Sequence, residues 1–205
     1  ADRCLMIAKN GEIIDGDQIL NILATSYLAE GKLNKKTVVG TVMSNLGFIK
    51  SMQAADIKVE KTAVGDRYVL EKMLENDYTL GGEQSGHIIM RQFSNTGDGL
   101  LTALQVMQVV TKSKKSLQEL ASAMQKYPQV LINVKDVAKE KLASSAKIKE
   151  AILESEKELA DSGRVLLRAS GTESLVRVMV EANDLELAQK VADSLAQLVR
   201  SELKQ

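Results

Sequence analysis

The chain has 205 residues, of which 44% are hydrophobic and 3% aromatic, and its formal net charge is zero. This length allows one large or two modest domains with aliphatic cores, and the zero charge argues against a broad nucleic-acid-binding surface. No apolar run approaches membrane-spanning length, so no membrane segment is expected. The single cysteine, Cys4, excludes an intramolecular disulfide and indicates a reducing compartment, the cytoplasm. It lies in an apolar run, which favours a buried structural thiol over a nucleophile.

Strands and helices alternate through the first hundred residues. This order predicts an α/β fold with a mixed, parallel-rich sheet and helices on both faces. Asp15 and Gln18 have the spacing of a capping box, which predicts a helix from there to about residue 28. The expected strands are residues 3–8, 37–43, 57–63, 78–80 and 87–91. One expected helix spans residues 46–55, a second begins within residues 64–67 and ends near residue 75, and a third begins after the turn at residues 95–99 and ends near residue 112.

The second part of the chain predicts a small α+β domain with an antiparallel sheet. The first domain is expected to span residues 1–115, a linker helix 116–128, and the second domain 129–205, because the only proline, Pro128, ends the linker. Asn183 is predicted to cap the last helix, with Glu186 three residues later. The other expected elements are strands at residues 130–134, 165–167 and 175–180 and a helix at 145–160.

The most informative segment is the loop at residues 168–173 between the last two predicted strands. It combines Gly171 with the hydroxyls of Ser170 and Thr172 and with the guanidinium of Arg168, and Arg177 follows closely. Glycine lets the backbone approach a ligand, and arginines bind phosphate through two parallel hydrogen bonds. Period-2 alternation places Arg177 on the side of its strand opposite the valines. The alternative is a polar hairpin with surface arginines, because short Ser/Gly/Thr loops are common.

A second loop, GGEQSGH at residues 81–87, is also rich in polar groups. Glu83, Ser85 and His87 form a compact set of donors and acceptors that matches the hydroxyls of a sugar. His87 considered alone is more typical of a surface histidine or a satisfied core histidine than of a ligand-binding one. Asp66 and Arg67 could simply begin a helix, and an Asp98 N-cap is favoured over a metal ligand.

With these loops and the opening Ala-Asp-Arg, the chain resembles the C-terminal half of the α-D-phosphohexomutase family, in particular its bacterial glucosamine branch. The resemblance covers essentially the whole chain. It implies that Glu83, Ser85 and His87 read the sugar, and that Arg168, Ser170, Gly171, Thr172 and Arg177 hold the phosphate. It also implies active-site support from Arg3, Asp66 and Arg67, and a metal-ligand role for Asp2. Ser174 departs from the family's usual proline, which loosens the exit of the loop.

The resemblance further implies phosphoryl transfer between the 6- and 1-hydroxyls of glucosamine through a phosphoserine and a bisphosphate intermediate. The resemblance places the serine in the family's first domain, which has no counterpart here, and two of the three Mg²⁺-binding aspartates just upstream of Ala1. We therefore expect a fragment without activity of its own, in which Asp2 alone holds Mg²⁺ poorly. The expected partners are the phosphosugar and the missing domains, in an enzyme that could be a homodimer, with no nucleic acid and no membrane. A related hexose-phosphate mutase, a non-catalytic phosphosugar-binding module and a structural piece remain alternatives.

Overall fold

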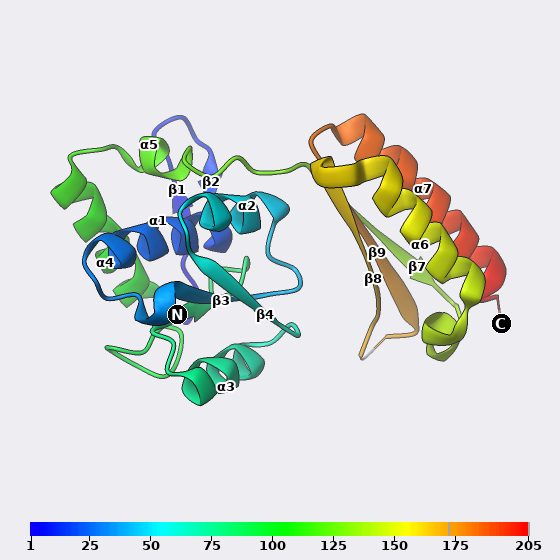
Figure 1. The fold of residues 1–205 in the computed structure, drawn as a ribbon, viewed down its shortest axis with the longest axis horizontal. Helices are drawn as coiled ribbons and strands as arrows, with labels where there is room; N and C mark the ends of the chain where they lie inside the picture. The colour runs from blue at the N-terminus through cyan, green and yellow to red at the C-terminus, as the bar shows by residue number, and fades with distance from the viewer. Residues whose placement is uncertain (172, 205) are drawn as a thin grey trace. The chain divides into compact units, whose positions relative to one another are not determined.

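The computed structural model describes residues 1–171 and 173–204 and divides into two compact units, Ala1–Lys126 and Tyr127–Gln205 (Figure 1). The sequence placed the end of the first domain at residue 115 and a linker helix at 116–128. The boundary lies further along because Ala121 and Met124 are buried in the first core, and helix α5 spans only Leu117–Ala121. Within the described residues, no helix is both long and apolar enough to cross a membrane.

The first unit is built on a four-stranded sheet with the order β4-β3-β5-β6. Its strands are β3 (Thr37–Thr41), β4 (Lys58–Thr62), β5 (Leu80–Gly82) and β6 (Ile88–Met90). β3 pairs in parallel with β4 and with β5, and only β6 runs antiparallel. The predicted parallel-rich sheet is therefore confirmed.

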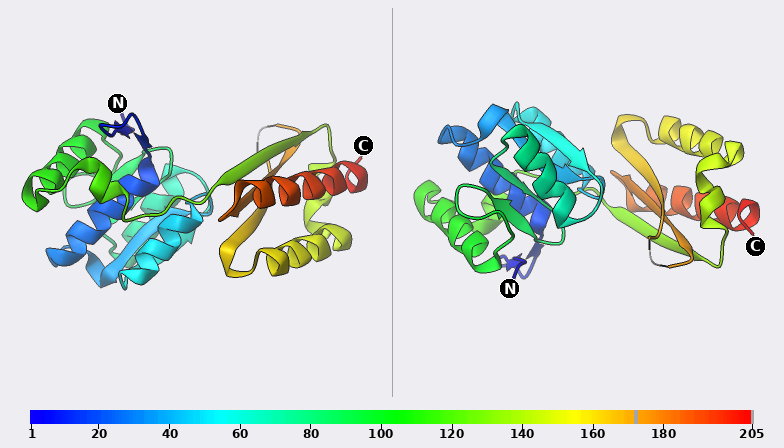
Figure 2. Two further views of the ribbon diagram at one scale, coloured as in Figure 1. Left: turned by 90° about the horizontal axis from the view of Figure 1, so that it is seen from above. Right: turned by 90° about the horizontal axis from the view of Figure 1, so that it is seen from below.

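Helices cover both faces of this sheet, as predicted (Figures 1 and 2). They are α1 (Gly16–Ala29), α2 (Leu46–Ala54), α3 (Asp66–Asn76) and α4 (Gly99–Ser113). Leu20 and Phe48 fill the larger core on the side of α1 and α2, and Val69 and Met73 of α3 fill the smaller one on the opposite face. The Asp15 capping box is present: its carboxylate accepts from the Gln18 N–H, and the Gln18 side chain accepts from the Asp15 N–H.

A short hairpin precedes the sheet. Its strands, β1 (Met6–Ile7) and β2 (Ile13–Ile14), are antiparallel, and β1 is shorter than the predicted strand 3–8. Cys4 lies just before it, buried, and its N–H donates to the Gly86 carbonyl at 3.0 Å. Burial raises the pKa of the Cys4 thiol, as expected for a structural cysteine.

The second unit has a three-stranded antiparallel sheet with the order β7-β9-β8. Its strands are β7 (Gln129–Lys135), β8 (Gly163–Ala169) and β9 (Leu175–Ala182), and its helices are α6 (Ala146–Leu159) and α7 (Leu185–Glu202). Both helices lie on one side of the sheet, where the valines of β9 are buried (Figure 1). The cap of α7 differs from the prediction, because Asp184 rather than Asn183 accepts from the N–H groups of Glu186 and Leu187.

Candidate functional site

In the first unit, the loop at residues 83–87 leaves the carboxyl end of β5 and is held by three other segments. The Gly65 N–H, in the turn after β4, donates to Glu83 Oε1 at 3.0 Å. The Gly16 N–H donates to the Gln84 carbonyl at 3.0 Å, and Cys4 bonds to Gly86 as described above. The loop predicted to read the sugar is thus fixed at the edge of the sheet where ligands of parallel sheets bind.

His87 is buried and has both ring nitrogens engaged. Nδ1 lies 3.2 Å from Asp2 Oδ2, and the Gly97 N–H lies 3.2 Å from Nε2. Because a backbone N–H can only donate, Nε2 is the acceptor, and Nδ1 carries the proton that bonds Asp2. These contacts match the alternative of a satisfied core histidine. A direct bond from His87 to a sugar would have to replace one of them.

Asp2 is largely exposed, with 60% of its side chain accessible. Its own backbone N–H and the His87 ring hold the pKa of the Asp2 carboxyl below its usual range. Asp66 is also exposed, and its Oδ2 lies 4.0 Å from His87 Nε2. The structure therefore places Asp2 and Asp66 beside the His87 ring, which sequence spacing alone could not show.

The remaining predicted residues of this unit point to solvent. Ser85 and Arg3 are exposed. Arg67 Nε pairs with Glu71 Oε1 at 2.7 Å, one helical turn away, and its side chain is 81% exposed. Asp98 is the N-cap of α4 and accepts from the Leu101 N–H at 2.9 Å, as the sequence favoured. These contacts leave Ser85 available to a ligand and give Asp98 a structural role.

The sequence missed Gly97 as a site residue. A Cβ at this position would lie 2.5 Å from His87 Nε2, so only glycine lets the turn approach the imidazole and donate to it. The signal was the Asn-Thr-Gly-Asp-Gly run, which predicted a turn but not its contact. Gly97 thus helps to fix the His87 tautomer.

The described residues do not form a metal site by themselves. No group of three or more His, Cys, Asp or Glu side chains within them is placed to hold an ion. Magnesium usually needs several carboxylates or a substrate phosphate together with one. Asp2 supplies a single carboxylate, so the described residues do not complete such a site without further ligands.

In the second unit, Arg168 of β8 lies directly opposite Arg177 of β9. Their neighbours Leu167, Val176 and Val178 face the helices, so both arginines lie on the face that α6 and α7 leave uncovered. Both Nε atoms are buried without a hydrogen-bond partner among the described residues. Arg177 has one acidic neighbour, with its Nη2 3.8 Å from Glu173 Oε2. Like charges directly opposite on a sheet repel each other, so this pair is suited to an anion.

Hydrogen bonds hold the described residues on either side of Thr172. Ser170 is buried, its Oγ accepts from the Glu173 N–H at 3.2 Å, and its N–H donates to the Leu175 carbonyl at 2.9 Å. A Cβ on Gly171 would meet no atom within 4 Å, so packing inside the protein does not explain this glycine. Thr172, a predicted phosphate ligand, lies outside the described residues. The sequence also missed Lys139, whose Nζ donates to the Ser170 and Glu173 carbonyls at 2.7 and 2.8 Å.

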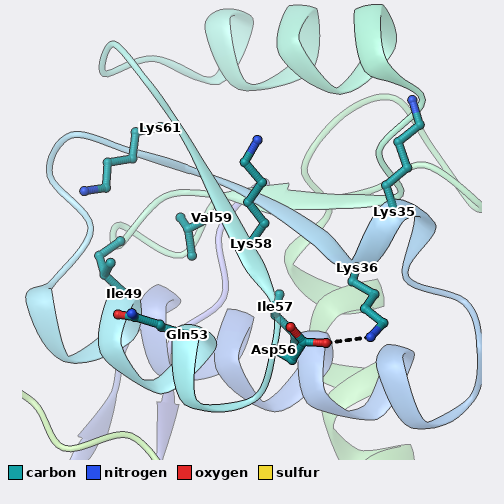
Figure 3. Close-up of a pocket in the computed structure, with 9 residues that line it drawn as sticks. All are labelled: Lys35, Lys36, Ile49, Gln53, Asp56, Ile57, Lys58, Val59 and Lys61. Carbon is teal, nitrogen blue, oxygen red and sulfur yellow. Dashed lines mark hydrogen bonds and ion pairs between the residues drawn. The ribbon is translucent and has the colours of Figure 1, made fainter.

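A cavity of about 510 Å³ in the first unit is a competing candidate (Figure 3). It is lined by Lys35, Lys36, Lys58 and Lys61, whose amino groups lie apart from one another in Figure 3. Lys36 pairs with Asp56 at 2.6 Å, and Lys58 pairs with Glu60 at 2.6 Å. The positive charges neither converge nor face a common point, so the cavity lacks the geometry of an anion site.

Comparison with known proteins agrees with this division into two units. Residues 15–127 match the phosphoglucomutase/phosphomannomutase α/β/α domain III, and residues 131–198 match the C-terminal domain of the same family. The chain belongs to the phosphoglucomutase/phosphomannomutase family.

The relatives narrow this class. The chain is 56% identical over 203 residues to a phosphoglucosamine mutase of Nocardioides sp. and 55% identical to one of Streptomyces griseus. In both cases 99% of this chain is covered, and the chain spans about half of the relative, 45%. The fold resembles the crystal structure of Aspergillus fumigatus N-acetylphosphoglucosamine mutase in complex with GlcNAc-6P and magnesium. That likeness has a TM-score of 0.82 at 20% identity and covers 98% of this chain and 47% of that one.

Proposed function

We propose that the chain is the phosphosugar-binding part of a phosphoglucosamine mutase, an isomerase that interconverts glucosamine 6-phosphate and glucosamine 1-phosphate. The observation that carries the proposal is the cross-strand pair Arg168 and Arg177. Their guanidinium groups share one uncovered face, and their Nε atoms have no hydrogen-bond partner in the part of the chain that the structure describes. The relatives named phosphoglucosamine mutase support the choice of substrate.

In this proposal the two units have different tasks. Arg168 and Arg177, with Ser170, Gly171 and Thr172, hold the phosphate that is not transferred, and the arginines supply paired, charge-assisted hydrogen bonds. Glu83 and Ser85 accept from and donate to sugar hydroxyls, and His87 positions Asp2 beside them. Catalysis then depends on positioning and on electrostatic stabilisation of the transferred group.

The phosphoryl donor would be a phosphoserine in the N-terminal domains of the same enzyme. Mg²⁺, when bound, would neutralise charge on that phosphate. Asp2 is the one ligand this chain would offer, and the low pKa of its carboxyl keeps it ionised. Arg3, Asp66 and Arg67 would add charge around the substrate. The buried, unpaired Cys4 supports a cytoplasmic location, and a homodimer of the whole enzyme is part of the proposal.

The proposal is tested by calorimetry on this chain. We expect glucosamine 6-phosphate to bind at millimolar concentration or tighter, inorganic phosphate to compete with it, and free glucosamine to compete only weakly, because the charged phosphate makes the strongest contacts. The chain alone should show no turnover of the bound sugar phosphate. Absence of binding would favour a purely structural role, and turnover would mean that the phosphoryl carrier has been misassigned.

In the whole enzyme, Glu83→Gln should reduce sugar discrimination more than phosphate affinity. The amide oxygen can still accept from the Gly65 N–H, so the loop keeps its shape while the second carboxylate oxygen is lost as an acceptor. Leaving a sugar hydroxyl unpaired costs about 1–3 kcal/mol. The measurement is kcat/KM for the glucosamine, glucose and mannose phosphates, with Glu83→Ala as the variant that also releases Gly65. An equal loss for all three sugars would contradict a role for Glu83 in reading the ring.

A further inference from the structure

In the second unit, Lys139 bonds to the loop that joins β8 to β9. It begins the short 3₁₀ helix η2 (Lys139–Ser144), 31 positions before Ser170 in the sequence. Its backbone is anchored, because Val137 and Ala138 are buried and the Ala138 N–H donates to the Leu203 carbonyl at 2.8 Å. Its Nζ bonds to the carbonyls at both ends of the loop, Ser170 and Glu173. One ammonium group thus joins two carbonyls that lie three positions apart in the sequence.

The position of Lys139 fixes the side from which it reaches the loop. It lines a cavity of about 510 Å³ together with Ile148 and Ile152 of α6 and Leu167 of β8. These three residues belong to the core between the sheet and its helices. Lys139 therefore approaches from the helix-covered side. Arg168 also borders this cavity, but alternation along β8 and β9 directs the side chains of Arg168 and Arg177 to the opposite face of the sheet.

This arrangement sets the direction of two peptide planes. In a trans peptide the C=O and the following N–H point in opposite directions. Because the Ser170 and Glu173 carbonyls accept from Lys139, the N–H groups of Gly171 and Ser174 point away from its amino group. No hydrogen bond within residues 1–171 and 173–204 uses either of these N–H groups.

We propose that Lys139 is a positioning residue for phosphate binding, which turns the Gly171 and Ser174 N–H groups toward the anion held by Arg168 and Arg177. The inference rests on the proposed function, because it takes that anion to be the substrate phosphate. Oriented backbone N–H groups are a recurrent way to bind anions. Gly171 then has a reason to be glycine, since a side chain would stand between its N–H and the ligand.

The test titrates inorganic phosphate into the unaltered chain, Lys139→Met and Lys149→Met, and follows affinity by calorimetry and amide resonances by NMR. Lys149 lines the same cavity and is exposed, and no hydrogen bond of its side chain to the loop is observed among the described residues. Its replacement therefore removes an equal charge without touching the loop. We expect about tenfold weaker binding for Lys139→Met, because the loop loses its preorganisation, and less than twofold for Lys149→Met.

The NMR signals separate positioning from a general loss of stability. In the unaltered chain, phosphate should shift the Gly171 and Ser174 amide protons downfield, as hydrogen bonds form, and the shift should shrink in Lys139→Met at saturating phosphate. If these two signals stay in place in the unaltered chain, the inference is overturned whether or not Lys139→Met folds. Equal affinity of Lys139→Met and the unaltered chain would overturn it while leaving the proposed function intact. No phosphate binding by the unaltered chain would overturn both.

Discussion

Replacing Arg168 with lysine should weaken glucosamine 6-phosphate binding by about 10- to 150-fold although the charge is unchanged. Lysine keeps the Coulomb attraction but cannot present a planar pair of donors to two phosphate oxygens. Losing one charge-assisted hydrogen bond costs roughly 1.5–3 kcal/mol, which corresponds to this range of affinities. Calorimetry on the chain measures the effect directly.

Arg200→Lys is the matched control, because Arg200 is exposed in the last turn of α7, and its affinity should stay unchanged. Arg168→Leu is a second, independent test. It removes one of two facing like charges, so without phosphate it should unfold at the same temperature as the unaltered chain or higher, while binding no phosphate. If Arg168→Lys binds normally and phosphate does not compete, residues 168–173 form an ordinary polar hairpin.

Gly16→Ala should destabilise the first unit by about 2–3 kcal/mol, although alanine is the better helix former by about 0.5–1 kcal/mol. A Cβ on Gly16 would lie 2.1 Å from the Glu83 carbonyl oxygen and 2.6 Å from the Gly86 nitrogen. These are backbone atoms, which cannot move aside as a flexible side chain could. The steric cost of the new Cβ therefore exceeds the gain in helix propensity, and residues 83–87 must shift. Denaturant unfolding gives the loss of free energy.

Gly171→Ala is the control for this prediction, because its Cβ would meet open space. Its free energy of unfolding should change by less than about 0.5 kcal/mol, the usual range for surface substitutions. If Gly16→Ala is as stable as Gly171→Ala, the contacts between the start of α1 and the loop at residues 83–87 do not hold the loop in place.

The sequence predicts the order and type of the elements well, because hydrophobic periodicity and caps are local signals. The Asp15 capping box and the antiparallel sheet of the second unit follow from such signals. The cap of α7 was placed one residue too early, since Asn183 and Asp184 are both good caps and only the backbone path decides between them. The segment at residues 116–126 was taken for a linker because its burial depends on contacts with a distant core.

The candidate site is less predictable from the sequence, because its contacts join residues that lie far apart in the chain. Glycine-rich loops mark where ligands can approach, but they do not show which side chains are already engaged. His87 illustrates this, because its partners Asp2 and Gly97 are distant or inconspicuous in the sequence. Lys139 carries no local signal at all, since a lysine in a charged stretch is typical of solvated surface. Only the fold brings its amino group to the carbonyls of the loop.

The two units described above have cores made of different residues, and the residues proposed to read the sugar and to hold the phosphate belong to different units. If Glu83 reads the sugar as proposed, changes of sequence around it would alter which sugar is accepted without reshaping the strands that carry Arg168 and Arg177. With this division, sugar specificity would evolve in the first unit while the phosphate-binding strands of the second unit stay the same.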